Sequence, residues 1–294
     1  MKIALVTYQD KGAYHAINVS NEDDLLINYL HDKGLIITKE IWNDSAVKWE
    51  DYDVAIIKSP WDYFDHISDF YAWLQHMESL NIRLLNPVDT LKWNADKRYL
   101  NDIKSAGLNI TPTEFLSSSS ELELSSYFST YDCEQIIVKP AVSGGSKNTF
   151  KLTKDNFESN LPLIKQLIEK ETFIVQPFLK EIETDGEMSF LFFGGKFSHA
   201  VLKKAAAGDF RVQATFGGTV HPQNPSPDII LKAKAYVNQF AKDCLYARVD
   251  TATINEELVL MELELIEPFL FLDTNTNALE NYYQALSILL LKEL

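Results

Sequence analysis

Charged side chains alternate with apolar ones near the C-terminal end of the sequence, in a pattern suited to holding a metal ion or a phosphate. The alternation on both sides of a short polar turn predicts a β-hairpin. With that turn centred on Glu256, Asp250 pairs with Glu262 and Arg248 pairs with Glu264. Because successive side chains of a strand point to opposite faces, these four charged groups share one face of the hairpin.

The opposed carboxylates of Asp250 and Glu262 need a compensating charge. Two carboxylates about 5 Å apart repel by about 3 kcal/mol at an effective dielectric of about 20, which exceeds the roughly 1 kcal/mol gained by a favourable cross-strand pair. A divalent cation would compensate, because Mg²⁺ takes oxygen ligands and completes its shell with water and substrate phosphates. The alternative is an amphipathic hairpin whose charges point into water. Either way, the apolar face of Val249, Leu263 and Leu265 is expected to be buried.

A second segment combines a lysine with a loop of small residues. Lys139 ends a predicted strand that begins at Ile136, and four small residues follow shortly after it. These four are Ser143, Gly144, Gly145 and Ser146. Such a loop lets backbone amides approach phosphate oxygens while the lysine supplies a positive charge. The spacing is not that of a Walker A loop, and an ordinary hairpin turn is the alternative.

The hairpin and the glycine loop together describe a site for a nucleoside triphosphate outside the P-loop class. The loop and lysines would bind phosphate, and the carboxylates would bind Mg²⁺. An acidic protein needs a locally positive pocket for such a ligand. The candidates for that charge are Lys97, Lys139, Arg211 and Arg248.

Composition excludes several other classes of function. The chain has 294 residues and a formal net charge of -15, which disfavours binding to nucleic acid or acidic membrane surfaces. No apolar run approaches the roughly 20 residues of a membrane span, and the run 3–6 is too short for a signal-peptide core. We therefore expect a soluble, cytoplasmic protein. Its two cysteines and six histidines lack the spacing of a disulfide framework or a zinc site.

The elements that must position these residues change character along the chain. The first 90 residues read strand, helix, strand, helix, strand, which is typical of a parallel sheet with helices on its faces. The predicted runs are 3–6, 23–35, 54–57, 64–80 and 83–85. In the second helix, one buried stripe is expected to contain Phe70, Trp73, Leu74 and Met77. A single glycine follows the first strand, so a dinucleotide-binding turn is not predicted there.

The remaining residues favour antiparallel sheets with a few helices. Strand-like runs come in pairs, a helix is expected through 97–106, and 117–120 reads as a serine-rich loop. The predicted strands are 136–138, 149–152, 173–179, 188–193, 197–202, 248–254 and 258–265, and the later helices are 161–169 and 229–244. The fold class is thus α/β followed by α+β. We expect an N-terminal domain at 1–90, a smaller unit at 91–179 and a larger unit at 180–294.

These motifs, in this order, resemble the ATP-grasp superfamily, and within it bacterial glutathione synthetases and the ligases of the D-cycloserine type. The likeness covers roughly residues 90–275, and the first 90 fit the α/β domain that precedes the ATP-grasp fold. It implies a nucleotide site between two antiparallel-sheet subdomains. Lys139 with its loop matches the strand lysine and the phosphate-covering loop of the family, and Lys97 matches the earlier phosphate-contacting lysine.

The resemblance also implies roles for residues that contact the nucleotide and the metal. Gln176, Phe178 and Leu179 stand at the hinge that reads adenine, although many relatives have Glu in place of Gln176. Glu183 matches the ribose-binding glutamate, and Met261 stands where an apolar side chain packs under adenine. The three Mg²⁺ ligands are matched by Asp250, Glu262 and Glu264, the last in place of a common Asn.

For the reacting groups the resemblance implies fewer residues. Arg211, followed by Gly217 and Gly218, resembles the arginine and glycine pair around the acyl phosphate; a surface ion pair is the alternative for Arg211. Arg248 could stabilise the reacting phosphoryl group, or simply pair with Glu264. Trp61 and Asp62, at the end of a strand, match a Trp-Asp-Tyr stretch of the cycloserine type and are candidates for substrate binding. A Trp61 side chain packed in the core is the alternative.

The expected activity is ATP-dependent ligation of a carboxylate to an amine or thiol through an acyl phosphate, on a small amino-acid-like or peptide-like metabolite. The cofactors implied are ATP and two Mg²⁺ ions, with Mn²⁺ as a substitute, and a homodimer is compatible with the resemblance. One alternative is an intramolecular cyclisation of the cycloserine type, which needs one substrate. Another is a nucleotide-binding module that has lost catalysis, which the retained lysines and carboxylates argue against.

Overall fold

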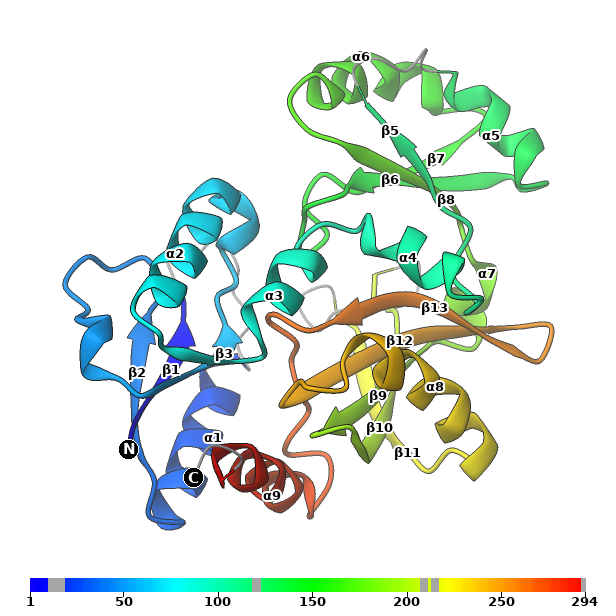
Figure 1. Cartoon of the computed structure of the whole chain (residues 1–294). Coiled ribbons are helices and arrows are strands. Elements are labelled where there is room, and N and C mark those ends of the chain that lie inside the picture. The colour runs from blue at the N-terminus through cyan, green and yellow to red at the C-terminus, as the bar shows by residue number, and fades with distance from the viewer. Residues whose placement is uncertain (10–18, 118–122, 207–210, 213–216, 292–294) are drawn as a thin grey trace.

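Three β-sheets organise the structure, a computed structural model that describes residues 1–9, 19–117, 123–206, 211–212 and 217–291 (Figure 1). The N-terminal sheet is parallel and the other two are antiparallel. This confirms the predicted class, α/β followed by α+β. Within the described residues, no helix has the length and apolar character needed to span a bilayer.

The N-terminal sheet has the strand order β2-β1-β3-β4. Its elements are β1 (Lys2–Thr7), α1 (Val19–Asp32), β2 (Ile36–Ile41), β3 (Val54–Ser59), α2 (Ile67–Ser79) and β4 (Arg83–Leu85). The predicted stripe on α2 is buried as expected. Strand β2 was not predicted, because it is an edge strand whose side chains are mostly exposed and the expected helix ran on to residue 35.

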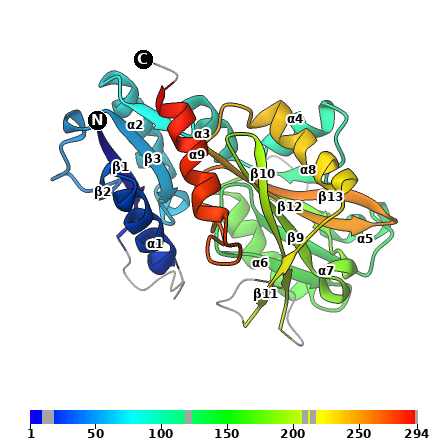
Figure 2. The ribbon, with the colours of Figure 1, turned by 90° about the horizontal axis from the view of Figure 1, so that it is seen from below.

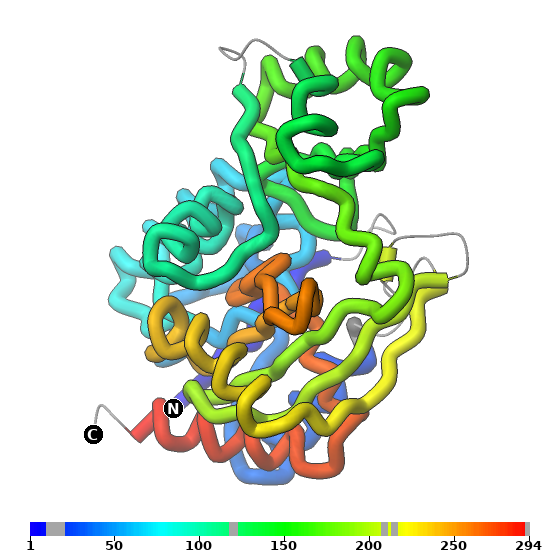
Figure 3. Tube along the Cα trace, turned by 90° about the vertical axis from the view of Figure 1, so that its right-hand side faces the viewer, coloured from blue at the N-terminus to red at the C-terminus, as the bar shows by residue number. Residues whose placement is uncertain are grey.

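The smaller antiparallel sheet has the order β5-β8-β6-β7 and forms one end of the molecule (Figure 3). Its elements are β5 (Glu114–Leu116), α5 (Leu124–Thr130), β6 (Gln135–Pro140), β7 (Phe150–Thr153), α6 (Phe157–Ile168) and β8 (Phe173–Pro177). The predicted pairing of the runs 136–138 and 149–152 is confirmed. Apart from Ser117, the predicted serine-rich loop lies outside the described residues.

The larger antiparallel sheet has the order β11-β10-β9-β12-β13. Its elements, with the helices around it, are α3 (Val88–Asn94), α4 (Tyr99–Ser105), α7 (Lys180–Thr184), β9 (Glu187–Phe193), β10 (Lys196–Lys204), β11 (Thr219–Gln223), α8 (Pro227–Phe240), β12 (Tyr246–Ile254) and β13 (Glu257–Glu264). Strands β9 and β10 form the predicted hairpin, and both Gly194 and Gly195 in its turn have positive φ. Glycine suits that turn because it has no Cβ to oppose this conformation.

The hairpin of β12 and β13 has the predicted pairs but a different turn. Asp250 lies opposite Glu262, and Arg248 lies opposite Glu264. The turn is not centred on Glu256; instead Asn255 and Glu256 form a two-residue turn with positive φ at both positions. A bulge between Asp250 and Thr251 then restores the predicted register. The bulge leaves Met261 as an extra residue, so that Met261 and Glu262 both reach the same cavity.

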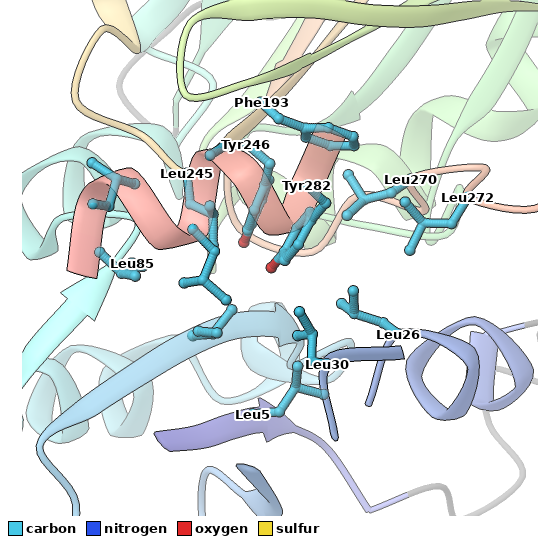
Figure 4. Close-up of a cluster of buried hydrophobic side chains, with 14 of the residues drawn as sticks. Leu5, Leu26, Leu30, Leu85, Phe193, Leu245, Tyr246, Leu270, Leu272 and Tyr282 are labelled. Atoms are coloured by element: carbon cyan, nitrogen blue, oxygen red, sulfur yellow. The ribbon is translucent and has the colours of Figure 1, made fainter. Parts of the chain in front are cut away.

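The C-terminal helix α9 (Ala278–Leu291) packs between the N-terminal sheet and the larger sheet (Figure 2). Tyr282 lies among Leu26 and Leu30 of α1, Leu5 of β1, and Phe193 of β9 (Figure 4). This helix was not predicted. Its core is shared with residues from the start of the chain, so the proposed boundaries at 1–90, 91–179 and 180–294 describe sequence segments whose packing overlaps.

The side chain of Asn86 joins the N-terminal sheet to the larger sheet. It is fully buried and directly follows β4. Its amide nitrogen donates to the carbonyl oxygens of Tyr246 and Leu265, at 3.0 and 2.8 Å. Its amide oxygen accepts from the backbone nitrogen of Leu245 at 2.7 Å. One side chain thus satisfies backbone groups where β12 begins and just after β13 ends.

We expect Asn86→Ala to lower the free energy of unfolding by about 3 kcal/mol, because several buried backbone groups lose their partner. Urea denaturation followed by circular dichroism measures this change. Asn101→Ala, an exposed residue of α4, is the matched control and should change stability by no more than about 0.5 kcal/mol. Equal stability of the two variants would contradict the role given to Asn86.

Candidate active site

A cavity of about 180 Å³ lies between the smaller and the larger antiparallel sheet. Most of the residues singled out in the sequence line it, although they come from segments far apart in the chain. They are Lys97, Lys139, Ser143, Gly144, Ser146, Gln176, Phe178, Leu179, Arg211, Met261, Glu262 and Glu264. The structure therefore brings the predicted phosphate loop, hinge and hairpin to one place.

Lys97 connects the two sides of this cavity. Its ammonium donates to the carbonyl oxygen of Ser143 at 2.9 Å and lies 3.1 Å from a carboxylate oxygen of Glu262. Two flanking side chains fix the turn that carries it. Asn94 bonds to the backbone of Leu263 and Leu265, and the hydroxyl of Tyr99 accepts from the nitrogen of Leu263. The exposed edge of β13 is thereby covered, and Lys97 is held beside Glu262.

Lys139 adds a second positive charge from β6. Burial and the nearby ammonium of Lys97 lower its pKa, while Glu262 opposes the shift. Burial alone would raise the pKa of Glu262, but the two lysines hold it below its usual range. A polyanion entering this cavity would meet two ammonium groups that share one carboxylate partner.

The glycine loop contacts the N-terminal domain. A Cβ atom added to Gly144 would collide with the ring of Phe64, so the ring occupies the space that a side chain would need. Lys147, also in this loop, forms an ion pair with Asp65. Phe64 and Asp65 belong to a short 3-10 helix at Tyr63–Asp65. The predicted phosphate loop is therefore covered from outside by residues that follow Trp61 and Asp62.

The predicted hinge connects β8 to α7. Gln176 is buried and donates from its side-chain amide to the hydroxyl of Thr113 at 2.9 Å. Phe178 lies under the ammonium of Lys151, which is 3.8 Å from the ring centroid and also pairs with Glu183 at 2.7 Å. Glu183 does not line the cavity, because Lys151 holds its carboxylate.

Asp250 is enclosed by donors and does not line the cavity. Its carboxylate accepts from both Nε and Nη2 of Arg248, from the hydroxyl of Ser189 at 2.5 Å and from Lys203 at 3.3 Å. Although burial would raise the pKa of this carboxyl group, Arg248 and Lys203 hold it well below its usual range. Arg248 also pairs with Glu264, as one of the two sequence interpretations proposed.

The remaining acids of the cavity lie in a less favourable environment. Burial, with Asp250 and Glu262 nearby, raises the pKa of Glu264 to about 8 despite the attraction of Arg248. Burial and the charges of Glu264 and Glu262 raise the pKa of Glu267 well above its usual range. Carboxylates that resist ionisation next to one another are suited to a bound cation, which would relieve their repulsion.

These acids supply the carboxylate oxygens that a divalent cation needs, but they are not arranged as a complete metal site. Across the described ranges, no three His, Cys, Asp or Glu side chains form a metal site by themselves. The predicted set of Asp250, Glu262 and Glu264 is not assembled, because Arg248 and Lys203 hold Asp250 away from the cavity. Of this predicted set, Glu262 and Glu264 remain on the cavity wall. Mg²⁺ commonly uses one or two carboxylates and completes its shell with water and phosphate, so the donor set still suits it.

The substrate candidates lie beside the cavity instead of on its wall. The indole nitrogen of Trp61 donates to the carbonyl oxygen of Glu267 at 2.9 Å, and Asp62 accepts from the indole of Trp42 at 2.6 Å. Gly145, Gly217 and Gly218 do not line the cavity either. Trp61 therefore holds the loop that carries Glu267.

Sequence reasoning missed three charged residues of this region. Glu187 and Glu267 line the cavity, and Lys203 pairs with Glu187 and lies 3.3 Å from Asp250. Lys203 lies on β10 and reaches across β9 to Asp250 on β12, a contact that needs the strand order. The available signal was position, because Glu187 and Lys203 are charged residues that directly flank the predicted strands 188–193 and 197–202. Glu267 gave no such signal because it lies in a loop.

Comparisons with known proteins agree with this geometry. The N-terminal domain model of D-cycloserine synthetase DcsG matches residues 3–86, and the ATP-grasp domain model of prokaryotic glutathione synthetase matches residues 104–265. The cycloserine biosynthesis protein DcsG of Streptomyces lavendulae is 24% identical in an alignment of 274 positions that covers 85% of this chain and 88% of that protein.

Solved structures share the whole fold. The crystal structure of D-cycloserine synthetase DcsG superposes with a TM-score of 0.86 at 23% identity, over 98% of this chain and 99% of the other. The crystal structure of D-alanine--D-alanine ligase from Bacillus anthracis complexed with ATP superposes with a TM-score of 0.72 at 18% identity, over 99% of this chain and 96% of the other. Since the glutathione synthetase domain model spans more than half of the residues, this chain belongs to the ATP-grasp family and is a ligase of that family.

Proposed function

We propose that this ligase activates a substrate carboxylate with ATP and joins the acyl group to an amine or thiol on a small amino-acid-like or peptide-like metabolite. The observation that carries the proposal is the convergence of Lys97, Lys139, the glycine loop, the hinge and two glutamates on one cavity. Phosphate-binding, adenine-binding and metal-binding groups are all needed at such a site, and all line the same space.

The proposed reaction has two steps. A carboxylate oxygen of the substrate attacks the γ-phosphorus, the bond to the ADP oxygen breaks, and an acyl phosphate forms. The amine or thiol then attacks the acyl carbon, loses a proton, and phosphate leaves. Lys97, Lys139 and Arg211 would neutralise the charge on the phosphoryl oxygens. The glycine loop, packed against Phe64, would keep water from the acyl phosphate.

We assign the cation to Glu262 and Glu264, with Asp250 as a third ligand if Arg248 releases it. Mg²⁺, bound as two ions or replaced by Mn²⁺, would offset the negative charge of the phosphate groups. Gln176, Phe178, Leu179 and Met261 would enclose the adenine, and Glu183 would reach the ribose if it leaves Lys151.

A second candidate is an intramolecular cyclisation. The match of residues 3–86 to the DcsG N-terminal domain favours it, because that part of the chain covers the glycine loop and contacts the Glu267 loop. Ligation needs a carboxylate and a separate nucleophile, whereas cyclisation needs one molecule that carries both. The product distinguishes them: ligation yields the combined mass of two substrates less water, and cyclisation yields the mass of one less water.

A substrate panel tests the proposal. The protein is incubated with ATP, Mg²⁺ and carboxylates, each alone and with amines, amino acids or thiols, and ADP release is measured together with product mass. We expect carboxylate-dependent ADP release. Nucleotide binding without turnover across the panel would favour a module that has lost catalysis.

Partners and location belong to the same proposal. We expect small-molecule substrates and no nucleic-acid partner, since the formal net charge is -15. The cytoplasm supplies ATP, and we propose it as the site of action. A homodimer is the proposed assembly, and light scattering coupled to gel filtration measures it.

We predict that Glu262→Gln lowers the kcat of Mg²⁺-dependent ADP release about 100-fold or more, because an amide is a poor ligand for the cation. The nearly equal size of glutamine should keep the fold, which circular dichroism and urea denaturation check. Glu257→Gln, an exposed residue of the same hairpin paired with Lys232, is the control and should leave turnover unchanged. Undiminished turnover in Glu262→Gln would place the metal elsewhere.

Gly144→Ala should lower kcat/KM for ATP by up to about 100-fold, because the new Cβ collides with Phe64 and displaces the loop. The double variant Gly144→Ala/Phe64→Ala removes the collision and should recover part of that loss. Steady-state kinetics with varied ATP measures both. A single variant with normal kinetics would show that the loop does not work in the position described.

A further inference from the structure

Glu267 differs from the other acids that line the cavity. Glu187 pairs with Lys203, Glu262 with Lys97, and Glu264 with Arg248. The carboxylate of Glu267 makes no hydrogen bond or ion pair to any residue that the structure describes, yet it faces the same cavity. A half-buried carboxylate without a cationic partner is costly, so its retention calls for a ligand that supplies the positive charge.

The backbone around Glu267 is held firmly, although its side chain is not. Trp61 donates to the carbonyl oxygen of Glu267 itself at 2.9 Å. Arg248 donates to the carbonyl oxygen of Phe269 at 3.0 Å, and His199 contacts that of Leu270 at 3.0 Å. The side chains that make these bonds come from the loop that follows β3, from β12 and from β10. The segment is therefore fixed by three elements of two domains, which suits a recognition group that must be placed in advance.

A buried ion pair of the N-terminal domain completes this support. Glu22 accepts from the backbone nitrogens of Leu270 and Leu272, at 2.8 and 3.1 Å, and its carboxylate is 2.9 Å from the ammonium of Lys58. Both side chains are no more than 3% exposed. The domain beside the cavity thus fixes the loop through its backbone and leaves the carboxylate of Glu267 available.

We propose that Glu267 binds the ammonium group of an amino-acid-like substrate. The inference rests on the proposed function, whose reaction begins at a carboxylate in this cavity. An ammonium group offers three donors and a positive charge to a carboxylate in a sheltered site, where a charged hydrogen bond is strong. In an α-amino acid the ammonium and carboxylate groups share one carbon atom. Anchoring the first therefore positions the second.

A metal ion is the less suitable occupant for Glu267. The two glutamates assigned to the cation lie on β13, next to Lys97 and the glycine loop. Glu267 lies beyond the end of that strand, in the loop bound by Trp61 of the N-terminal domain. The N-terminal domain thus holds the backbone of Glu267, whereas the two glutamates assigned to the cation pair with Lys97 and Arg248.

The experiment compares wild-type protein, Glu267→Gln and the control Glu257→Gln. Isothermal titration calorimetry, with Mg²⁺ and a non-hydrolysable ATP analogue present, measures binding of D- and L-alanine and serine against D- and L-lactate and glycerate. These hydroxy acids replace only the ammonium group. We expect wild-type protein and Glu257→Gln to bind at least one amino acid more tightly than its hydroxy acid. Glu267→Gln should lose about 100-fold in affinity for that amino acid and less than about threefold for the hydroxy acid.

The outcomes separate this inference from the proposed function. Equal losses for the amino acid and the hydroxy acid, or no preference for any amino acid in wild-type protein, would overturn the role of Glu267. A raised half-saturating concentration of Mg²⁺ in Glu267→Gln, with substrate preference intact, would also overturn it and make Glu267 a metal ligand. Glu267-dependent amino-acid binding without ADP release would support this inference while refuting the proposed ligation.

Discussion

The ammonium of Lys97 is the contact on which the cavity depends. It joins a turn between two helices to the carbonyl oxygen of Ser143 in the glycine loop and to Glu262 on β13. A lysine that is 7% exposed needs such acceptors, because a buried charge without them would be expensive. The two antiparallel sheets are therefore linked by a charge at the place where a triphosphate has to be held.

The register of the β12–β13 hairpin determines which acidic side chains lie close to the ammonium of Lys97. A two-residue turn alone would have paired these strands one residue out of the predicted register, and the bulge at Met261 corrects it. Because of the bulge, Met261 and Glu262 both line the cavity, which places an apolar side chain next to a carboxylate. Asp250 is kept out of it by Arg248 and Lys203, so the local charge balance differs from what the strand pattern implied.

The N-terminal domain acts on the cavity from two directions. Phe64 and Asp65 contact the glycine loop, while Trp61 and Glu22 hold the loop of Glu267. Three of these four residues lie within five positions of one another, directly after strand β3. A movement of this short segment would reach the glycine loop and the loop of Glu267 together. The described residues of this domain therefore support two parts of the cavity wall without lining the cavity itself.

How much of the fold and of the candidate site could be predicted depends on how far apart in the sequence the contacting residues lie. Lys139 with its loop, and the pairs of the β12–β13 hairpin, are local in sequence, and alternation was enough to find them. Contacts across strand order or between domains were not accessible. Lys203 and Asp250 lie on strands separated by β9, and the bond from the indole of Trp61 to the carbonyl oxygen of Glu267 joins residues 206 positions apart. A local sequence pattern can identify the residues of one wall of the cavity, but long-range packing determines which residues lie on the opposite wall. For that reason the glycine loop, the hinge and the hairpin were recognisable early, and the Glu267 side of the cavity became visible only in the fold.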